Sequence, residues 1–208
     1  MSKNKRVYAD IDLDAVVYNM ESMYQNIAPG TKMAAVIKTD GYGHGAKEIA
    51  QAIEFLPYLW GYAVATVDEA MVLRRHGIRK PVLILGITFE DQFPEMIEHD
   101  IRPAVCEYAS AQKLSAAAVA AGKNCCIHIK IDTGMSRIGF QVSEKTAETI
   151  AQIAKLPNII VEGIFTHFAR ADETDKRYTY DQMERFQNMI HMIEEKGVSI
   201  PIKHCSNS

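Results

Sequence analysis

A lysine at the end of an apolar strand is the most chemically suggestive residue of the sequence. Lys38 closes the apolar run Met33–Lys38 and precedes the glycine-rich segment Gly41–Gly45. In α/β barrels the carboxyl ends of the strands form the active face, and partial desolvation there lowers the pKa of a lysine. The resulting amine is a nucleophile that can form a Schiff base. A solvated lysine closing a strand is the commoner arrangement, and only the whole segment Ala34–Gly45 favours this chemistry.

Other segments bring polar side chains to the ends of apolar runs. Lys130–Gly139 reads K-I-D-T-G-M-S-R-I-G, and it contains the arginine Arg137, a planar cation with several N–H donors. This segment reads equally well as a strand, a tight turn at Gly134 and a surface arginine. His167 follows another apolar run, where a lone histidine is more often a core or rim residue. The sequence ends on His204–Ser208.

Composition excludes several classes of function. The formal net charge is -3 over 208 residues, which favours neither nucleic acid nor an anionic membrane surface as a partner. No apolar run approaches the roughly 18 residues that a membrane span needs, and the N-terminus lacks the apolar core of a signal peptide. The 4 cysteines include no C-x-x-C, and the 7 histidines show no metal-ligand spacing. These features predict a cytoplasmic protein without a metal.

Short β-branched runs alternate with amphipathic segments along the chain. The strands are expected over Met33–Lys38, Trp60–Ala65, Val82–Gly86, Ile101–Val105, Cys126–Ile131, Ile159–His167 and Ile202–Cys205. The helices are expected over Asp14–Ile27, Ala46–Phe55, Thr66–His76, Phe89–Glu98, Tyr108–Ala121, Ser143–Lys155 and Tyr178–Lys196, with stops at Gly77 and Gly197. This alternation predicts repeated βα units wound into a barrel or an open sheet.

The two ends of the chain do not fit a closed barrel. Val7–Ile11 would supply an eighth strand, but Asp10 and Asp12 place two acids on one of its faces. A barrel strand is enclosed by side chains inside and by helices outside, so such a strand fits poorly. The chain also stops at Ser208 without a further helix, and its 208 residues fall short of the roughly 250 of a full barrel. We therefore expect an incomplete barrel.

The segment around Lys38 is similar to the pyridoxal-phosphate attachment motif of alanine racemases, which usually reads V-K-A-N-A-Y-G-H-G. The sequence departs from that motif at Thr39, Asp40 and Gly41, and it keeps the lysine and the Y-G-H-G. The resemblance implies that Lys38 holds pyridoxal 5′-phosphate and acts as one of two bases. It also implies that Tyr42 contacts the cofactor phosphate.

The resemblance extends over essentially the whole chain. Lys130–Gly139 looks like the family's K-V-D-T-G-M-x-R-x-G, which implies that Arg137 reaches the substrate carboxylate and the phenolic oxygen of the cofactor. In many members the lysine matching Lys130 is carbamylated and orients that arginine. His167 would lie near the cofactor ring. His204–Ser208 resembles H-x-A-N-S with a serine in place of the alanine.

In that last motif Ser208 would donate to the phosphate, and Asn207 would support the site. The implied catalytic residues are therefore Lys38, Arg137 and His167. The implied cofactor-binding residues are Lys38, Tyr42, Arg137, His167, Asn207 and Ser208.

The resemblance also implies an organisation into domains. Residues 13–208 would form a (β/α)8 barrel domain of fold type III that binds pyridoxal phosphate and lacks its last strand. Residues 1–12 would contain a strand that pairs with a C-terminal β domain absent from this chain. The family's second base is a tyrosine from that domain of the partner subunit, so we expect a homodimer for the full-length protein and little activity from this fragment alone.

The implied function is the interconversion of L-alanine and D-alanine in the cytoplasm, supplying D-alanine for peptidoglycan. A serine racemase or a racemase of broad specificity is an alternative with the same chemistry. A non-catalytic pyridoxal-phosphate carrier would use the same lysine, although Arg137 in its motif speaks against it. A barrel that binds some other phosphorylated ligand would leave the segment around Lys38 unexplained.

Overall fold

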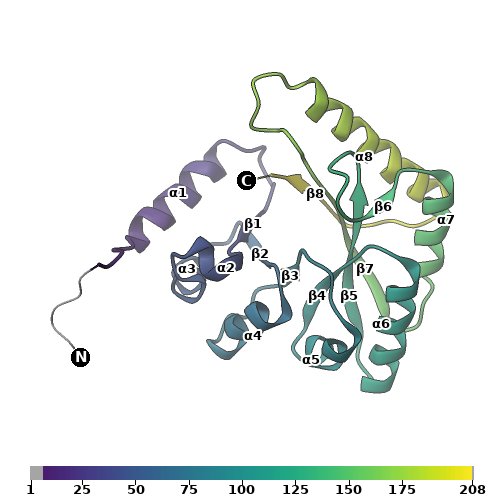
Figure 1. Cartoon of the computed structure of the whole chain (residues 1–208), viewed down its shortest axis with the longest axis horizontal. Coiled ribbons are helices and arrows are strands. Elements are labelled where there is room, and N and C mark those ends of the chain that lie inside the picture. Colours follow the sequence, from purple (N-terminus) through teal and green to yellow (C-terminus); the bar gives the residue numbers. More distant parts are fainter. Residues whose placement is uncertain (1–6, 208) are drawn as a thin grey trace. The chain divides into compact units, whose positions relative to one another are not determined.

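The computed structural model describes residues 7–207 (Figure 1). The chain divides at Pro81 into an N-terminal unit and a C-terminal unit that begins at Val82, and each is described by itself. None of the helices among the described residues combines the length and the apolar character needed to cross a membrane.

The N-terminal unit is built on two parallel strands, β1 (Met33–Val36) and β2 (Leu59–Val64), which place Ala35 opposite Tyr62. Its helices are α1 (Leu13–Gln25), α2 (Lys38–Tyr42), α3 (Ala46–Ile53) and α4 (Val67–Arg75). Helix α1 begins at Asp12, whose carboxylate accepts the backbone N–H of Ala15 at 3.0 Å. The buried apolar side chains of the unit include Ile49, Ile53, Leu59, Val64, Val67 and Leu73.

The C-terminal unit carries a parallel sheet in the order β3-β4-β5-β7-β8, with β6 paired to β5. These strands are β3 (Val82–Ile84), β4 (Ile101–Val105), β5 (Cys125–Asp132), β6 (Phe140–Gln141), β7 (Ile159–His167) and β8 (Ile202–Ser206). The helical elements are η1 (Glu90–Gln92), α5 (Phe93–Glu98), α6 (Tyr108–Ala121), α7 (Glu144–Ile153) and α8 (Arg177–Glu195). In Figure 1 the helices α6, α7 and α8 follow one another beside the strands of this unit.

Burial along the strands explains their composition. Every residue of β3 and β4 is buried, as expected for strands of a parallel sheet that is covered on both faces. The polar residues His128 and Lys130 are also buried within β5. Strand β5 is buried over most of its length, and the predicted site residues of this unit lie at or after the carboxyl ends of β5, β7 and β8.

Most predicted elements are confirmed. Strands Ile101–Val105 and Ile159–His167 and helix Tyr108–Ala121 have the predicted bounds. Gly77 and Gly197 follow α4 and α8 with φ values of 82° and 80°, in the left-handed conformation of a helix stop.

Three regions differ from the prediction. The helix expected over Phe89–Glu98 begins as the 3-10 turn η1 and becomes α-helical at Phe93, because Pro94 favours the first turn of a helix. The short strand β6 was not predicted. No strand forms over Val7–Ile11, because a strand needs a hydrogen-bonding partner and the described residues supply none there. Its pairing with a further β domain stays a prediction, and residues 1–6 lie outside the described residues.

Candidate functional site

Lys38 lies at the start of a left-handed turn in the N-terminal unit. Strand β1 ends at Val36, and the buried Ile37 donates its N–H to Ala63 O at 2.9 Å. Thr39, Asp40, Gly41 and Tyr42 then have φ values of 55°, 52°, 62° and 57°. This conformation costs roughly 1–2 kcal/mol for each residue with a side chain. Lys38 is therefore not simply the last residue of a strand, as the sequence predicted, but the residue that enters a strained turn.

Hydrogen bonds within the segment hold this turn. Gly41 N–H donates to Ile37 O at 2.9 Å, and Gly45 N–H donates to Asp40 O at 2.9 Å. The carboxylate of Asp40 accepts the N–H of Ala46, the first residue of α3, at 2.9 Å. The turn is thereby tied to the helix that follows it.

The turn brings the predicted pair Lys38 and Tyr42 together. Nζ of the half-buried Lys38 lies 5.9 Å from the centroid of the Tyr42 ring, which itself is 50% exposed. A Cβ atom built on Gly43 would meet no other atom within 4 Å. Open space therefore lies beside Gly43, directly after the half-exposed Tyr42.

The buried Lys130 dominates the electrostatics at the end of β5. Its Nζ atom lies 5.4 Å from the centroid of the Phe165 ring and donates to Ile131 O at 2.8 Å. Burial lowers the pKa of the Lys130 amine to about 8; nearby Arg137 acts in the same direction, while Asp132 opposes it. At pH 7 about a tenth of this amine is therefore unprotonated, far more than for an exposed lysine with a pKa of about 10.4.

Asp132 anchors the loop that carries Arg137. Its carboxylate accepts the N–H groups of Gly134 at 2.9 Å and Ser136 at 3.0 Å. Burial alone would raise the pKa of Asp132, but these backbone hydrogen bonds help to hold it below its ordinary value. Gly139 closes the loop with a φ of 123°, and a Cβ atom there would lie 2.9 Å from Asp132 N.

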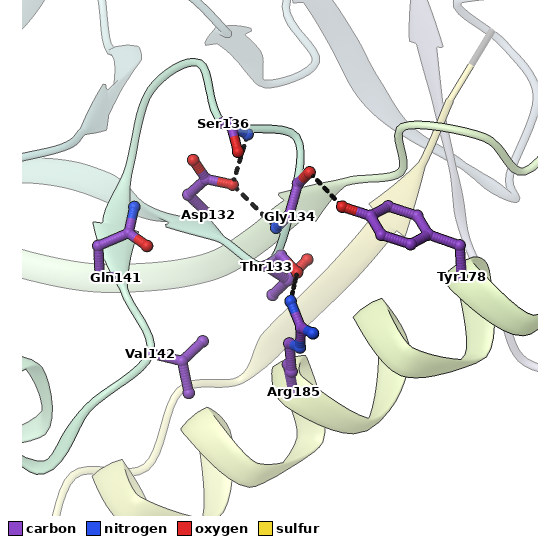
Figure 2. Close-up of a pocket in the computed structure, with 8 residues that line it drawn as sticks. All are labelled: Asp132, Thr133, Gly134, Ser136, Gln141, Val142, Tyr178 and Arg185. Carbon is purple, nitrogen blue, oxygen red and sulfur yellow. Dashed lines mark hydrogen bonds between the residues drawn. The ribbon is translucent and has the colours of Figure 1, made fainter.

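Helix α8 fixes the same loop from the other side. The Tyr178 hydroxyl donates to Gly134 O at 2.7 Å, and Arg185 donates to Thr133 O at 3.2 Å. Figure 2 shows these contacts around a cavity of about 450 Å³, whose lining residues are Asp132, Thr133, Gly134, Ser136, Gln141, Val142, Tyr178 and Arg185. The exposed Arg137 thus belongs to a loop that is held at several points and lies close enough to Lys130 to lower its pKa.

His167 and Asn207 follow neighbouring strands. His167 ends β7 and pairs in register with Ser206 of β8, and the next residue, Phe168, donates its N–H to Ser206 O at 3.1 Å. Asn207 Nδ2 donates to an oxygen of Asp172 at 3.4 Å. The two predicted residues therefore lie at the same end of adjacent strands. Ser208, the predicted phosphate ligand, lies outside the described residues.

A partly buried polar cluster lies on β4, β5, β7 and β8, and the sequence did not predict it. His128 Nδ1 lies 2.9 Å from His204 Nε2, and His128 Nε2 lies 3.2 Å from the Glu162 carboxylate. Arg102 Nε donates to the same carboxylate at 3.1 Å. The ring of His204 stacks on Phe165 at 4.8 Å. When both histidines are neutral, Glu162 accepts from His128, and His128 in turn accepts from His204.

The cluster strongly perturbs two ionisations. Burial by itself would raise the pKa of Glu162, but hydrogen bonds from His128 and Arg102 outweigh it and lower the pKa to about 2. Burial, together with His128 and Lys130, lowers the pKa of His204 to about 3. Polar residues at alternate positions of β5, His128 and Lys130, were the signal in the sequence for an inward-facing polar row.

Among the described residues no group of three or more His, Cys, Asp or Glu side chains is arranged to hold a metal ion.

The predicted site residues form one group in each unit. Lys38 and Tyr42 belong to the N-terminal unit, whereas Lys130, Arg137 and the residues after β7 and β8 belong to the C-terminal unit.

Comparison with known proteins identifies close relatives. A family model described as "Alanine racemase, N-terminal domain" matches residues 11–208. An alanine racemase of Clostridium tetani is 43% identical over 97% of this chain and 52% of that protein. An alanine racemase of Methanococcus maripaludis is 42% identical over 97% of this chain and 54% of that protein. The chain spans about half the length of the curated relatives it matches.

Solved structures agree with these matches. An alanine racemase of Clostridium difficile 630 has a TM-score of 0.92 and 41% identity over 94% of this chain and 51% of its own. Another structure of that protein is a complex with cycloserine. An alanine racemase from a D-cycloserine-producing Streptomyces lavendulae has a TM-score of 0.91 and 33% identity over 100% of this chain and 54% of its own. The predicted fold class, an incomplete (β/α)8 barrel, is confirmed.

Proposed function

Because this chain belongs to the alanine racemase family through a match over residues 11–208, we propose that the whole protein interconverts L-alanine and D-alanine with pyridoxal phosphate held by Lys38. The left-handed turn that presents Lys38 beside Tyr42 is the observation that carries this proposal. The chain covers 52% of its Clostridium tetani relative, so the activity is proposed for the whole protein.

The residues around Lys38 fit an aldehyde cofactor that bears a phosphate. Lys38 is only half-buried, which favours access to its amine for covalent attachment. The phenol of Tyr42 and the open space beside Gly43 provide a hydroxyl and room for a phosphate. When bound, pyridoxal phosphate supplies an electron sink that stabilises charge at the amino acid Cα.

Racemisation needs a base on each face of Cα. We assign one face to Lys38, which would take up or return the Cα proton at Nζ. The second base is proposed to be a tyrosine supplied by a C-terminal β domain of the partner subunit. The protein would accordingly act as a homodimer.

Residues of the C-terminal unit would orient the reactants. Arg137 is proposed to bind the substrate carboxylate and the phenolic oxygen of the cofactor through its several N–H groups. The unprotonated amine of Lys130 would attack carbon dioxide, forming an N–C bond and losing one proton to solvent. The resulting carbamate anion would accept hydrogen bonds from Arg137, which is near enough to influence the pKa of Lys130.

His167, Asn207 and Ser208 are proposed to border the cofactor, His167 near its ring and the other two near its phosphate. Asn207 and His167 follow adjacent strands at the barrel end where phosphate groups bind in many barrels. We further propose that the reaction takes place in the cytoplasm and supplies D-alanine for peptidoglycan.

Borohydride reduction after incubation with pyridoxal phosphate, followed by peptide mass mapping, tests the cofactor assignment. We expect a pyridoxyl group on Lys38 that is lost in Lys38→Ala and kept in Lys47→Ala, a matched change at a half-buried lysine of the same unit. Absence of the adduct from the folded whole protein would overturn the assignment. Parallel rate measurements with L-alanine and L-serine would then separate an alanine racemase from a serine racemase, and no turnover of either would favour a carrier.

A further inference from the structure

Glu69 on α4 accepts hydrogen bonds from two separate loops of the N-terminal unit. One carboxylate oxygen accepts the N–H of Thr39 at 2.7 Å, and the other accepts the N–H of Ala65 at 2.7 Å. Thr39 is the residue directly after Lys38, and Ala65 directly follows the last residue of β2. We call the left-handed segment that follows Lys38, residues 39–42, the Lys38 turn. A single carboxylate therefore joins the Lys38 turn to the carboxyl end of β2.

The bond to Thr39 lies where the backbone is least favourable. Thr39 is β-branched and has a φ of 55°, so its own conformational preference opposes the turn. Asp40 ties the far end of the segment to α3 through Ala46. Glu69 ties the near end, next to Lys38, and its charge makes both hydrogen bonds stronger than neutral ones.

The local sequence would direct this carboxylate elsewhere. Thr66 and Glu69 have the spacing of a capping box, in which the glutamate returns to the N–H of the N-cap residue. The first half of the box is present, because Thr66 Oγ1 accepts Glu69 N–H at 3.3 Å. The glutamate side chain instead binds Ala65 and Thr39. The helix thus directs its first-turn acid to the Lys38 turn.

We propose that Glu69 is a positioning residue that fixes the direction in which Lys38 leaves the backbone. This inference rests on the proposed role of Lys38 in holding the cofactor. The two N–H groups point at different oxygens of the carboxylate, so glutamine at position 69 would accept one of them and set its NH₂ donor against the other. Aspartate keeps the charge, but its side chain is shorter by about 1.5 Å, so it cannot reach both loops.

Amide hydrogen exchange and amine labelling, measured on the full chain without cofactor, test the proposal. In Glu69→Gln we expect exchange at Thr39 to accelerate at least about tenfold, which corresponds to about 1.4 kcal/mol. The Tyr62 amide, which donates to Pro81 O at 2.8 Å, should keep its protection and report an intact unit. The rate of Lys38 reductive methylation should change with the Thr39 exchange rate, and kcat of the whole protein should fall while KM stays similar.

Two further variants separate positioning from charge. Asp68→Asn removes the neighbouring charge from the same helix turn. It should leave Thr39 exchange unchanged, because Asp68 is exposed and the hydrogen bonds to Thr39 and Ala65 are made by Glu69. Glu69→Asp should accelerate Thr39 exchange as Glu69→Gln does, because neither side chain can accept both N–H groups. This variant also serves as the test if Glu69→Gln does not fold.

Unchanged Thr39 exchange and Lys38 labelling in Glu69→Gln and Glu69→Asp would overturn the inference, as would equal effects from Asp68→Asn. Pyridoxyl mapping of the wild type distinguishes this failure from that of the proposed function. An adduct on Lys38 with unaltered exchange in the variants refutes only the role of Glu69. Absence of the adduct from the wild type refutes the cofactor assignment itself.

Discussion

The half-buried ring of His204 predicts a loss of stability on mild acidification. An unfolded histidine has a pKa of about 6.5, whereas burial in the cluster with His128 lowers the pKa of folded His204 to about 3. Between these values the unfolded chain binds a proton at this position and the folded chain does not. Stability therefore falls as the pH drops below about 6.5 and continues to fall until about 3.

The magnitude follows from the gap between the unfolded pKa and the working pH. At about pH 5 the gap is about 1.5 units, and each unit is worth about 1.4 kcal/mol, so His204 removes about 2 kcal/mol relative to pH 7.5. Of the groups that face His204, the Glu162 carboxylate contributes little to this window. Glu162, with a folded pKa of about 2 and an unfolded value of about 4.3, is ionised in both states over most of it.

Urea unfolding followed by far-UV circular dichroism, at about pH 7.5 and about pH 5, measures this effect through the linear extrapolation. In His204→Gln the decrease in the free energy of unfolding from about pH 7.5 to about pH 5 should be smaller by about 2 kcal/mol, whatever the variant's stability at neutral pH. His191→Gln is the matched control, because the side chain of His191 on α8 is 73% exposed. Equal losses in wild type and His204→Gln would refute the reasoning.

Other expected outcomes concern the loop after β5. Gly139→Ala should destabilise the chain by roughly 2 kcal/mol, seen as a lower urea midpoint, because its φ of 123° and a Cβ only 2.9 Å from Asp132 N leave no room for a side chain. Unchanged stability would contradict the geometry. Tyr178→Phe should lose about 1 kcal/mol in the same assay by removing the 2.7 Å hydrogen bond to Gly134 O, and a smaller loss in Tyr180→Phe, at an exposed site, is the comparison. Because burial lowers the pKa of Lys130 to about 8, ¹³C-bicarbonate should give a carbamate resonance that is lost in Lys130→Ala; a signal that persists in that variant would assign it to another amine.

The alternation of strands and helices could be predicted because each element has its own periodicity and stop signals. The conformation of the Lys38 turn could not, since Thr39 is an unfavourable residue for a positive φ and the turn depends on Glu69, 30 positions away in sequence. Taken alone, the sequence spacing of Thr66 and Glu69 indicates only a local helix cap.

The site was predicted unevenly for a similar reason. Lys38, Tyr42 and Arg137 lie within compact motifs, so resemblance to a family was enough to make them candidates. The pairing of His128, His204 and Glu162 joins three strands, and no local pattern shows which side chains face one another across a sheet. Residues on neighbouring strands become partners only when the register is known.

The left-handed turn also bears on how this protein would respond to laboratory evolution. Asparagine or glycine adopts a φ near 55° more readily than threonine does, so Thr39→Asn or Thr39→Gly is expected to raise thermal tolerance. A library selected for heat resistance alone should accumulate these changes. A library selected for turnover is under a different constraint at this position, because the residue after Lys38 also affects the direction of the Lys38 amine. Position 39 is therefore a single site at which the two selections are expected to diverge.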